Sequence, residues 1–348
     1  MELYVSGESH GPVLIGTLVG FPANFPVDEN KIVQELQRRR SGYGRGARMT
    51  IENEAFSLVS GIYDGYTTGA PLSIEIPNRD HANWADTIGD AVTIPRPGHA
   101  DMAGYMKYRY PHLRPVMERA SARVTAGYVA AAALCKSLLE SLDVTFSSRP
   151  ATVDGIVNTA VTGYDDAIKT HIDKAKQEGR SLGGTVTVQI AGLPAGLGSF
   201  VHWASRIDST LSGILMSIPS VKGVVFGSGD DAERYEQDEL FYSEGSVVRQ
   251  TNNAGGIEGG MTNGEPVVFR LFVKPVPSSK QQKHSIDVIT CEQVSARYER
   301  SDTCVVDTIG VIAENMAAYI LLDAVMQRYG GDDYRFLKAR VENTKGEV

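Results

Sequence analysis

The chain has 348 residues, of which 42% are hydrophobic, and a formal net charge of -8 at neutral pH. This length and apolar content allow a large buried core, arranged as one large domain or as two ordinary ones. The negative charge excludes general affinity for nucleic acids or anionic membranes, because such partners need a broad positive surface. An anionic ligand must therefore be bound by a local group of cations.

The sequence shows no pattern typical of a signal peptide, a membrane-spanning helix or a disulfide-bonded protein. The N-terminal MELYVSGESHG lacks the basic and apolar regions of a signal peptide, and no run of about 18 apolar residues follows, so we expect a cytoplasmic protein that does not span a membrane. Cys135, Cys291 and Cys304 show neither CxxC spacing nor nearby paired histidines, which predicts reduced, mostly buried thiols and no metal site.

The predicted elements begin with an amphipathic helix through Ile32 and Leu36, capped by Asp28 and ending in the arginines that follow. Two long apolar helices are expected at 114–142, where alanines on every side predict burial all round, and at 309–329. Strands are expected at 56–60, 72–76, 144–147, 185–190, 221–226 and 267–273.

An internal repeat relates the two parts of the chain. Residues 61–76, GIYDGYTTGAPLSIEI, share glycines and a proline in register with residues 256–271, GIEGGMTNGEPVVFRL. Each copy is typical of a glycine-rich turn that leads into a strand through a proline. LVGFPAN at 18–24 and IAGLPAG at 190–196 form a second pair in the same order.

These patterns predict an α+β fold of two similar halves, approximately 1–150 and 185–330. The helices would pack between antiparallel sheets, as a β-α-β sandwich with an internal pseudo-two-fold repeat. We expect residues 1–348 to form a single catalytic domain, with the site where the halves meet.

Two N-terminal segments carry chemistry. In GESHGP, His10 lies between glycines, which suits a turn but also lets the backbone approach a ligand beside a group that titrates near neutral pH. Five arginines then fall close together: Arg38, Arg39, Arg40, Arg45 and Arg48. They could form a solvated basic face, yet arginine forks suit phosphate and carboxylate groups. GYGRG follows a helix rather than a strand and is not a dinucleotide fingerprint.

Two later segments repeat this theme. His99 follows a Pro-Gly turn just before a helix that Asp101 can start, and Arg119 and Arg123 lie in an apolar helix, where guanidinium groups need anions or salt bridges. Lys274 ends a strand before KPVPSS and could help to cradle a phosphate. Arg300 and Asp302 precede the second long helix and could also simply cap it.

GESHG, RRR-GYGRG-RM-IE, RPGHAD with ERASAR, NNAGGIEGG-TNG and RSDTC follow one another along the chain. In this order and at these intervals they resemble the chorismate synthase family over essentially the whole sequence. The resemblance implies a lyase that removes phosphate from 5-enolpyruvylshikimate 3-phosphate by 1,4-anti elimination to give chorismate, the last step of the shikimate pathway for aromatic amino acids. It further implies a homotetramer and reduced FMN (FMNH2) at each site, with no net redox change.

The resemblance also implies roles for single residues. His10 would stand by the departing phosphate, His99 by the N1/O2 edge of the flavin, and Asp302 would relay a proton from flavin N5, with Ser9 and Ser121 as helpers. The substrate clamp would be Arg39, Arg45, Arg48 and Arg123. The flavin contacts would be Arg119, Ala120, Ser121, Gly259, Lys274, Pro275, Val276, Pro277, Ser278 and Arg300.

The chain departs from the usual family residues at three places, which bear on local flavin contacts and not on the reaction: Arg109 to His112, Val124, and Gly213-Ile214. Two other functions stay open. A flavin-dependent oxidoreductase acting on a small phosphorylated acid would oxidise its flavin with turnover, and an RNA-binding arm at RRR-GYGRG would bind polynucleotides in a salt-dependent way. The reductant of the flavin is also open: an external flavin reductase, or NADPH used by the protein itself.

Overall fold

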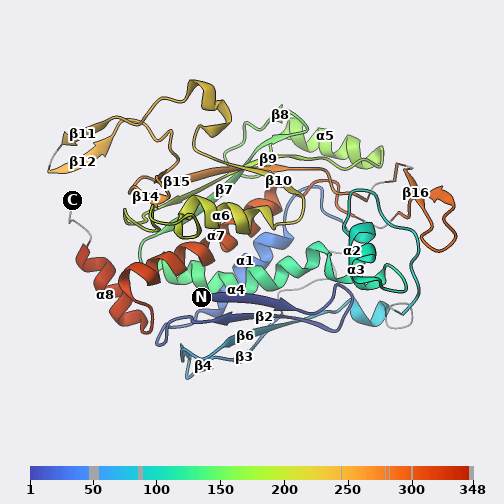
Figure 1. Ribbon diagram of the computed structural model, residues 1–348, viewed down its shortest axis with the longest axis horizontal. Coiled ribbons are helices and arrows are strands. Elements are labelled where there is room, and N and C mark those ends of the chain that lie inside the picture. Colours follow the sequence, from blue (N-terminus) through green and yellow to red (C-terminus); the bar gives the residue numbers. More distant parts are fainter. Residues whose placement is uncertain are drawn as a thin grey trace.

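Two antiparallel sheets enclose a layer of helices (Figure 1). The structure is a computed structural model that describes residues 1–46, 55–84, 89–243, 245–278, 280–281, 283–298 and 301–344. The first sheet has the order β1 (Glu2–Ser6), β2 (Val13–Val19), β6 (Leu72–Pro77), β3 (Ser57–Ser60). The second has the order β10 (Val221–Phe226), β15 (Val267–Val273), β9 (Gly184–Ala191), β7 (Thr145–Val153), β8 (Ile156–Val157).

The helices between the sheets are α1 (Glu29–Arg40), α4 (Thr125–Glu140), α6 (Ile207–Met216) and α7 (Val306–Tyr329). At the periphery lie α2 (Asp101–Tyr108), α3 (Arg114–Arg119), α5 (Asp166–Gln177) and α8 (Tyr334–Thr344). Within the described ranges, four short hairpins accompany these elements: β4 (Ile62–Tyr63) with β5 (Tyr66–Thr67), β11 (Leu240–Ser243) with β12 (Ser246–Arg249), β13 (Ile257–Glu258) with β14 (Met261–Thr262), and β16 (His284–Ile286) with β17 (Gln293–Ser295). The predicted α+β class and helix-between-sheets arrangement are confirmed.

The two copies of the repeat fold alike. Ile62 pairs with Thr67 in the first hairpin, and Ile257 pairs with Thr262 in the second. Each hairpin leads into an interior strand, β6 between β2 and β3, and β15 between β9 and β10. All three matched glycine pairs have φ values between 76° and 95°, which favour glycine: Gly61 and Gly256, Gly65 and Gly260, Gly69 and Gly264.

The second repeat pair joins the first through matching hydrogen bonds. The Thr67 hydroxyl donates to the Pro22 carbonyl at 2.6 Å, and the Thr262 hydroxyl donates to the Pro194 carbonyl at 2.7 Å. Each hydroxyl also accepts the backbone N–H three residues beyond that proline, at 2.9 Å in both copies. The same buried threonine therefore ties the same turn to the same hairpin in both halves.

The predicted helix over 114–142 is broken, and this prediction was wrong. The chain forms α3, then a 3₁₀ turn at Ala122–Val124, then α4. Ser121 adopts an extended conformation, with φ -72° and ψ 141°, and its hydroxyl accepts the Arg123 N–H at 3.3 Å. A serine that bonds to nearby backbone competes with helix and caps a new one instead.

The break also changes the setting of Arg119. The two arginines were expected to lie together in one apolar helix, but Arg119 is exposed and donates to the Val5 and Gly7 carbonyls. Arg123, beyond the break, is buried. The guanidinium group of Arg119 therefore lies at the surface, whereas that of Arg123 lies in the interior.

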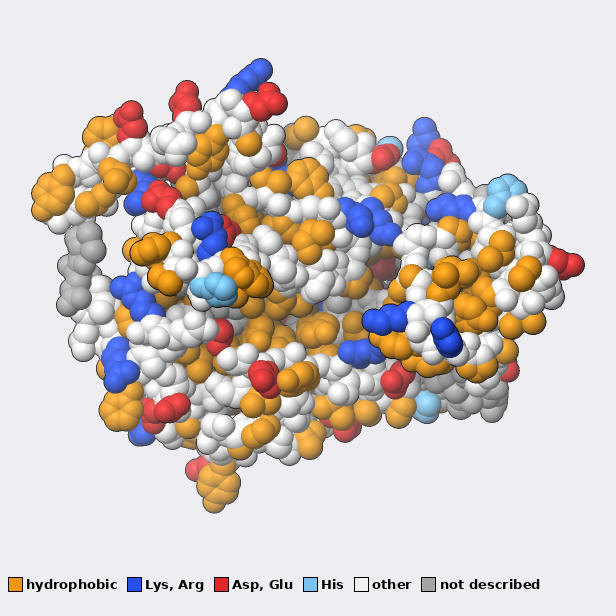
Figure 2. Space-filling view, in the orientation of Figure 1, with side chains coloured by type: hydrophobic (Ala, Val, Ile, Leu, Met, Phe, Trp, Pro, Cys, Tyr) orange, Lys and Arg blue, Asp and Glu red, His pale blue; other side chains and the backbone are white. Residues whose placement is uncertain are grey.

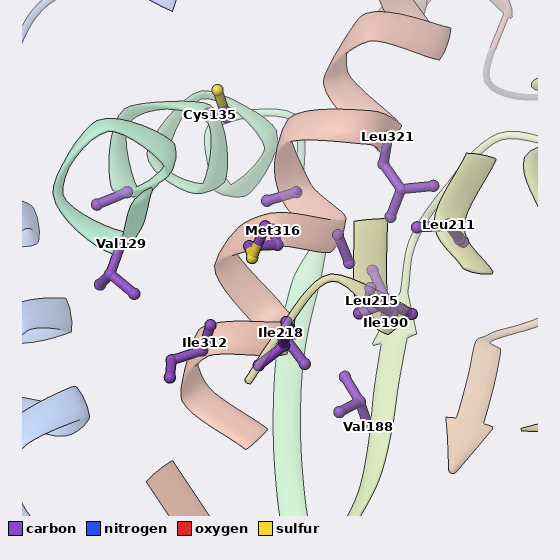
Figure 3. Packing of buried hydrophobic residues seen from close by; sticks show 14 of the residues in the cluster. Val129, Cys135, Val188, Ile190, Leu211, Leu215, Ile218, Ile312, Met316 and Leu321 are labelled. Atoms are coloured by element: carbon purple, nitrogen blue, oxygen red, sulfur yellow. The ribbon is translucent and has the colours of Figure 1, made fainter. Parts of the chain in front are cut away.

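Helices α4 and α7 form the centre of the core. Figure 3 shows Leu321 of α7 close to Leu211 and Leu215 of α6. One cluster of buried side chains extends through both sheets, whereas the single-domain organisation stays a prediction. Helix α7 is long and apolar enough to cross a membrane, but 78% of its most apolar window is buried, as in the core helix of a globular fold.

A charged network is buried within this helix layer. The Lys136 ammonium on α4 bonds Glu35 of α1 at 3.0 Å and Glu314 of α7 at 2.6 Å. Arg38 bonds both oxygens of Glu314 at 2.8 Å, and Asn315 donates to Glu35 at 2.6 Å. Burial opposes ionisation, but the bonds from Arg38 and the charge of Lys136 hold the pKa of Glu314 below its usual value. The network fixes the end of α1, where the arginine cluster begins.

Candidate active site

His10 is held by a buried glutamate that the sequence analysis did not single out. Its Nδ1 lies 2.9 Å from both carboxylate oxygens of Glu118, and its backbone N–H donates to Glu118 Oε2 at 2.8 Å. Burial opposes ionisation of Glu118, but the hydrogen bonds and charge of His10 hold the pKa of Glu118 below its usual value. Glu118 belongs to the ERASAR motif, yet a contact across 108 residues leaves no local signal.

The predicted helper serines lie beside this pair. The Ser9 hydroxyl donates to the Ser121 hydroxyl at 3.0 Å, and the Ser9 backbone N–H donates to the Glu118 carbonyl at 3.1 Å. On the other side, the Trp84 ring lies over the His10 ring at a centroid distance of 3.9 Å. Helix α3 and the turn before Trp84 therefore fix the GESHGP segment from two directions.

A pocket lined by four arginines lies between α1, the end of β6 and the start of α4. Arg39 and Arg123, both predicted to bind substrate, line it together with Arg40 and Arg79. Arg39 is buried, and its Nε donates to the Thr125 hydroxyl at 3.0 Å. Arg40 was in the sequence cluster without an assigned role, and Arg79 was missed because it stands far along the chain in the PNRDHANW segment.

The pocket adjoins the His10 region through Asp80, which also lines it. Asp80 accepts the Trp84 indole N–H at 3.1 Å, and Asn78, two residues earlier, donates to the Ser9 and Gly11 carbonyls. The cations and the histidine thus belong to one continuous region.

Arg45 is brought to Asp302. Their side chains form an ion pair at 2.8 Å, and Asp302 Oδ1 accepts the Gly46 N–H at 2.5 Å. The next acidic residue, Asp307, packs against Gly42, and burial raises its pKa to about 6. The loop after α1 is therefore tied to the start of α7 through carboxylates.

His99 has a buried carboxylate of its own. Its Nδ1 lies 2.7 Å from Asp101 Oδ1, and Asp101 also binds Arg96 through the backbone N–H, Nε and Nη2 at 2.8–3.0 Å. Burial would raise the pKa of Asp101, but the bonds from Arg96 and His99 hold it well below the usual range. Asp101 is the first residue of α2, and Arg96 is a further residue that the sequence analysis missed.

The predicted phosphate cradle faces the same turn. The Lys274 ammonium donates to the Gly98 carbonyl at 2.7 Å, and Pro277 lies beside Gly98. Further along the segment, the Ser278 carbonyl accepts the Ser301 hydroxyl at 2.7 Å. Residues 274–278 therefore connect the His99 turn with the Asp302 region.

Some predicted site residues are not brought together here. Gly259 lies in the β13–β14 hairpin before β15, and Lys274 follows the end of that strand. A strand of seven residues separates them by roughly 20 Å. Ala120 and Arg119 lie at the break between α3 and α4, close to Ser121. Arg48 and Arg300 lie outside the described residues.

In the described part of the chain, no group of three or more His, Cys, Asp or Glu side chains is placed so that it could hold a metal ion. Cys135 and Cys304 are buried, and Cys291 is exposed. What the arrangement offers instead is a set of guanidinium groups for anions and two histidines with carboxylate partners for proton transfer.

Comparison with known proteins gives a consistent result. Residues 1–326 match the family model described as chorismate synthase. A chorismate synthase of Caldanaerobacter subterraneus subsp. tengcongensis is 43% identical over 343 residues, covering 97% of this chain and 96% of the relative. One of Streptococcus sanguinis is 37% identical over 378 residues, covering 98% and 97%. A crystal structure of chorismate synthase superposes with a TM-score of 0.80 at 32% identity, covering 99% of this chain and 97% of the other.

Proposed function

This chain belongs to the chorismate synthase family of carbon–oxygen lyases, which catalyse the last step of the shikimate pathway, and we propose that it does so by a 1,4-anti elimination that uses reduced FMN. The substrate in this proposal is 5-enolpyruvylshikimate 3-phosphate. The observation that carries it is the four-arginine pocket beside His10. A small molecule with a phosphate and two carboxylates is the ligand that such a local cluster suits in an acidic protein.

Each side chain has a task in this reaction. Arg39, Arg45 and Arg123 bind the anionic groups of the substrate and hold it in place. His10 donates a proton or a hydrogen bond to the departing phosphate, because protonation and nearby cations both stabilise the charge that develops there. The carboxylate of Asp302 accepts the proton that the substrate loses, and Arg45 holds that carboxylate in position at 2.8 Å.

The residues around Lys274 fit the phosphate and ring of FMN. The Lys274 ammonium supplies a cation beside the turn at Gly98, whose φ of 77° favours glycine. When bound, reduced FMN would donate electron density transiently during the elimination and would be in its reduced form again at the end, so there is no net redox change. His99 would then hold a proton next to the ring.

An external flavin reductase is the simpler source of reduced flavin in this proposal, because the sequence lacks a dinucleotide fingerprint. NADPH bound by the protein itself is the alternative. In air, with NADPH and FMN but no reductase, product would form only if the protein reduces its own flavin.

The proposed reaction is tested anaerobically with dithionite-reduced FMN. We expect substrate to be converted to chorismate with one phosphate released per turnover, while the flavin spectrum is that of the reduced form before and after. Oxidation of the flavin in step with turnover would favour the oxidoreductase instead. Release of phosphate without chorismate would overturn both.

Arg123→Ala is expected to raise the KM for the substrate roughly 10- to 150-fold with little change in kcat, because a lost charge-assisted hydrogen bond costs about 1.5–3 kcal/mol. The measurement is steady-state kinetics in the same anaerobic assay. Arg335→Ala, which removes an exposed arginine on α8, is the control and should leave KM unchanged. An unchanged KM for the Arg123 variant would mean that this arginine has a structural role and does not bind the substrate.

We further propose that the protein is a cytoplasmic homotetramer. Figure 2 shows hydrophobic side chains on the projecting β11–β12 hairpin, where Leu240, Phe241 and Tyr242 are all exposed. Exposed apolar groups of this kind mark association surfaces. A second subunit could also bring Gly259 to a flavin that Lys274 binds, which one chain does not.

A further inference from the structure

Both histidines of the proposed site have a buried carboxylate at Nδ1, but the two carboxylates differ in what else they bind. Asp101, the partner of His99, is fully buried and receives three bonds from Arg96. Its negative charge is thus already matched by a guanidinium group. Little of that charge is left to favour a proton on His99.

Glu118, the partner of His10, is placed differently. Its side chain is 6% exposed, both of its oxygens lie 2.9 Å from His10 Nδ1, and in the described part of the chain its guanidinium ion pair is with Arg114, at 3.6 Å. At that distance Arg114 makes no hydrogen bond to the carboxylate. The charge of Glu118 is therefore directed mainly at the imidazole.

We propose that Glu118 is the positioning residue that makes His10 an acid: it holds Nδ1 as a hydrogen-bond donor and favours the protonated ring. This inference rests on the proposed role of His10 at the departing phosphate. A ring bonded to Glu118 through Nδ1 has Nε2 on its other side, as in the histidine–carboxylate pairs of other enzymes. Nε2 is then the atom that delivers the proton.

The proton balance of this step is simple. As the carbon–oxygen bond to phosphate breaks, the bonding electron pair leaves with the phosphate oxygen, and the Nε2 proton passes to that phosphate group. His10 becomes neutral with its remaining proton on Nδ1, still donated to Glu118. A proton from solvent restores the cation before the next turnover, so no oxidant or reductant is involved.

Among the described residues, the other groups around His10 come from α3 and the 78–84 turn. The Trp84 face at 3.9 Å favours a cationic ring, whereas Arg114, whose guanidinium lies 5.9 Å from the Trp84 ring, opposes it. His81 Nδ1 lies 2.8 Å from the His10 carbonyl oxygen rather than from its ring. Among these described groups, Glu118 has the shortest contact with the ring and carries the opposite charge.

The test is Glu118→Gln, which keeps size and shape but removes the charge. We expect the alkaline limb of kcat/KM to move to lower pH by about one unit, because an opposite charge at hydrogen-bond distance shifts a titration by that order. At pH 7.5 kcat should fall at least about tenfold. The control is Asp154→Asn, which removes the carboxylate from the exposed His171–Asp154 pair and should leave the profile unchanged.

His10→Ala separates this inference from the proposed function. Suppose that His10→Ala loses activity but the alkaline limb of the kcat/KM profile lies at the same pH in Glu118→Gln as in the parent protein. Glu118 then has only a structural role, and the inference is overturned. If His10→Ala keeps full kcat, the proposed role of His10 fails instead. In that case ¹⁵N shifts of labelled histidine still test the pairing: we expect the neutral His10 ring to carry its proton on Nδ1, and the Nε2–H form in the native protein would overturn it.

Discussion

Replacing His10 by alanine is expected to lower kcat by a factor of about 10²–10⁴ while FMN binding persists, because loss of a general acid typically costs that much. The imidazole stands next to the arginine pocket and is fixed by Glu118, so its removal takes away the proton donor without disturbing the cations. Single-turnover kinetics with dithionite-reduced FMN measure the chemical step directly. Flavin fluorescence titration checks that the cofactor site is intact.

His171→Ala is the matched control, because this histidine also pairs with a carboxylate but lies on the peripheral helix α5. Its kcat should equal that of the parent protein. His99→Ala and Asp302→Asn should each lower kcat at least about tenfold in the same assay. If all three site variants kept full kcat under anaerobic conditions, the assignment of proton roles would be wrong.

The second large effect concerns stability. Glu314→Gln is expected to destabilise the fold by about 3 kcal/mol at pH 7, because it removes one of the two carboxylates that offset the buried Lys136 ammonium and leaves only Glu35. Urea unfolding at a fixed protein concentration measures the difference in midpoint. Glu342→Gln, in an exposed pair with Lys338, is the control and should change stability by at most about 0.5 kcal/mol.

The pH dependence of that difference has a definite sign. The pKa of Glu314 is lowered by folding, so its contribution is complete above the pKa of an unfolded glutamate and is lost as pH falls below it. The gap between the parent protein and Glu314→Gln should therefore stay constant from pH 7 down to about pH 4.5, and narrow only as the pH falls further toward the lowered pKa of Glu314. If Glu314→Gln and Glu342→Gln lowered the stability by the same amount at every pH, the proposed stabilising role of the buried charged network would be wrong.

The sequence alone was enough to predict the two repeated turn-and-strand segments of this fold, because the signals that specify them are local. The turns at 61–69 and 256–264 need positive φ at matched positions, and glycine meets that need without reference to the rest of the chain. Helix α1 was predicted with its Asp28 cap, which accepts the Asn30 N–H at 3.0 Å. The strands at 221–226 and 267–273 carry enough apolar residues to be found directly.

The break in the helix at Ser121 and the pairing of β1 with β2 were not predicted. At Ser121 the helix preference of the alanine-rich run competes with the hydrogen bonds that the serine makes in the folded chain. The alanine-rich run from residue 114 to 142 favours helix throughout, and Ser121 breaks it only because its hydroxyl meets Ser9 and the Arg123 N–H in the folded chain. Strands β1 and β2 precede and follow the GESHGP turn, and their pairing was not predicted. Whether a serine caps or continues a helix depends on the partners it finds.

The sequence by itself thus determined the family motifs, the arginine cluster and the two histidines, because residue type and short spacing carry that information. Only the tertiary structure decided which groups touch: Glu118 with His10 and Arg96 with Asp101 at the His99 turn. It also separated Gly259 from Lys274 by the length of β15. The physical reason is that hydrogen bonds and charges act over a few ångströms, and packing of the sheets and helices, not distance along the chain, sets which atoms come that close.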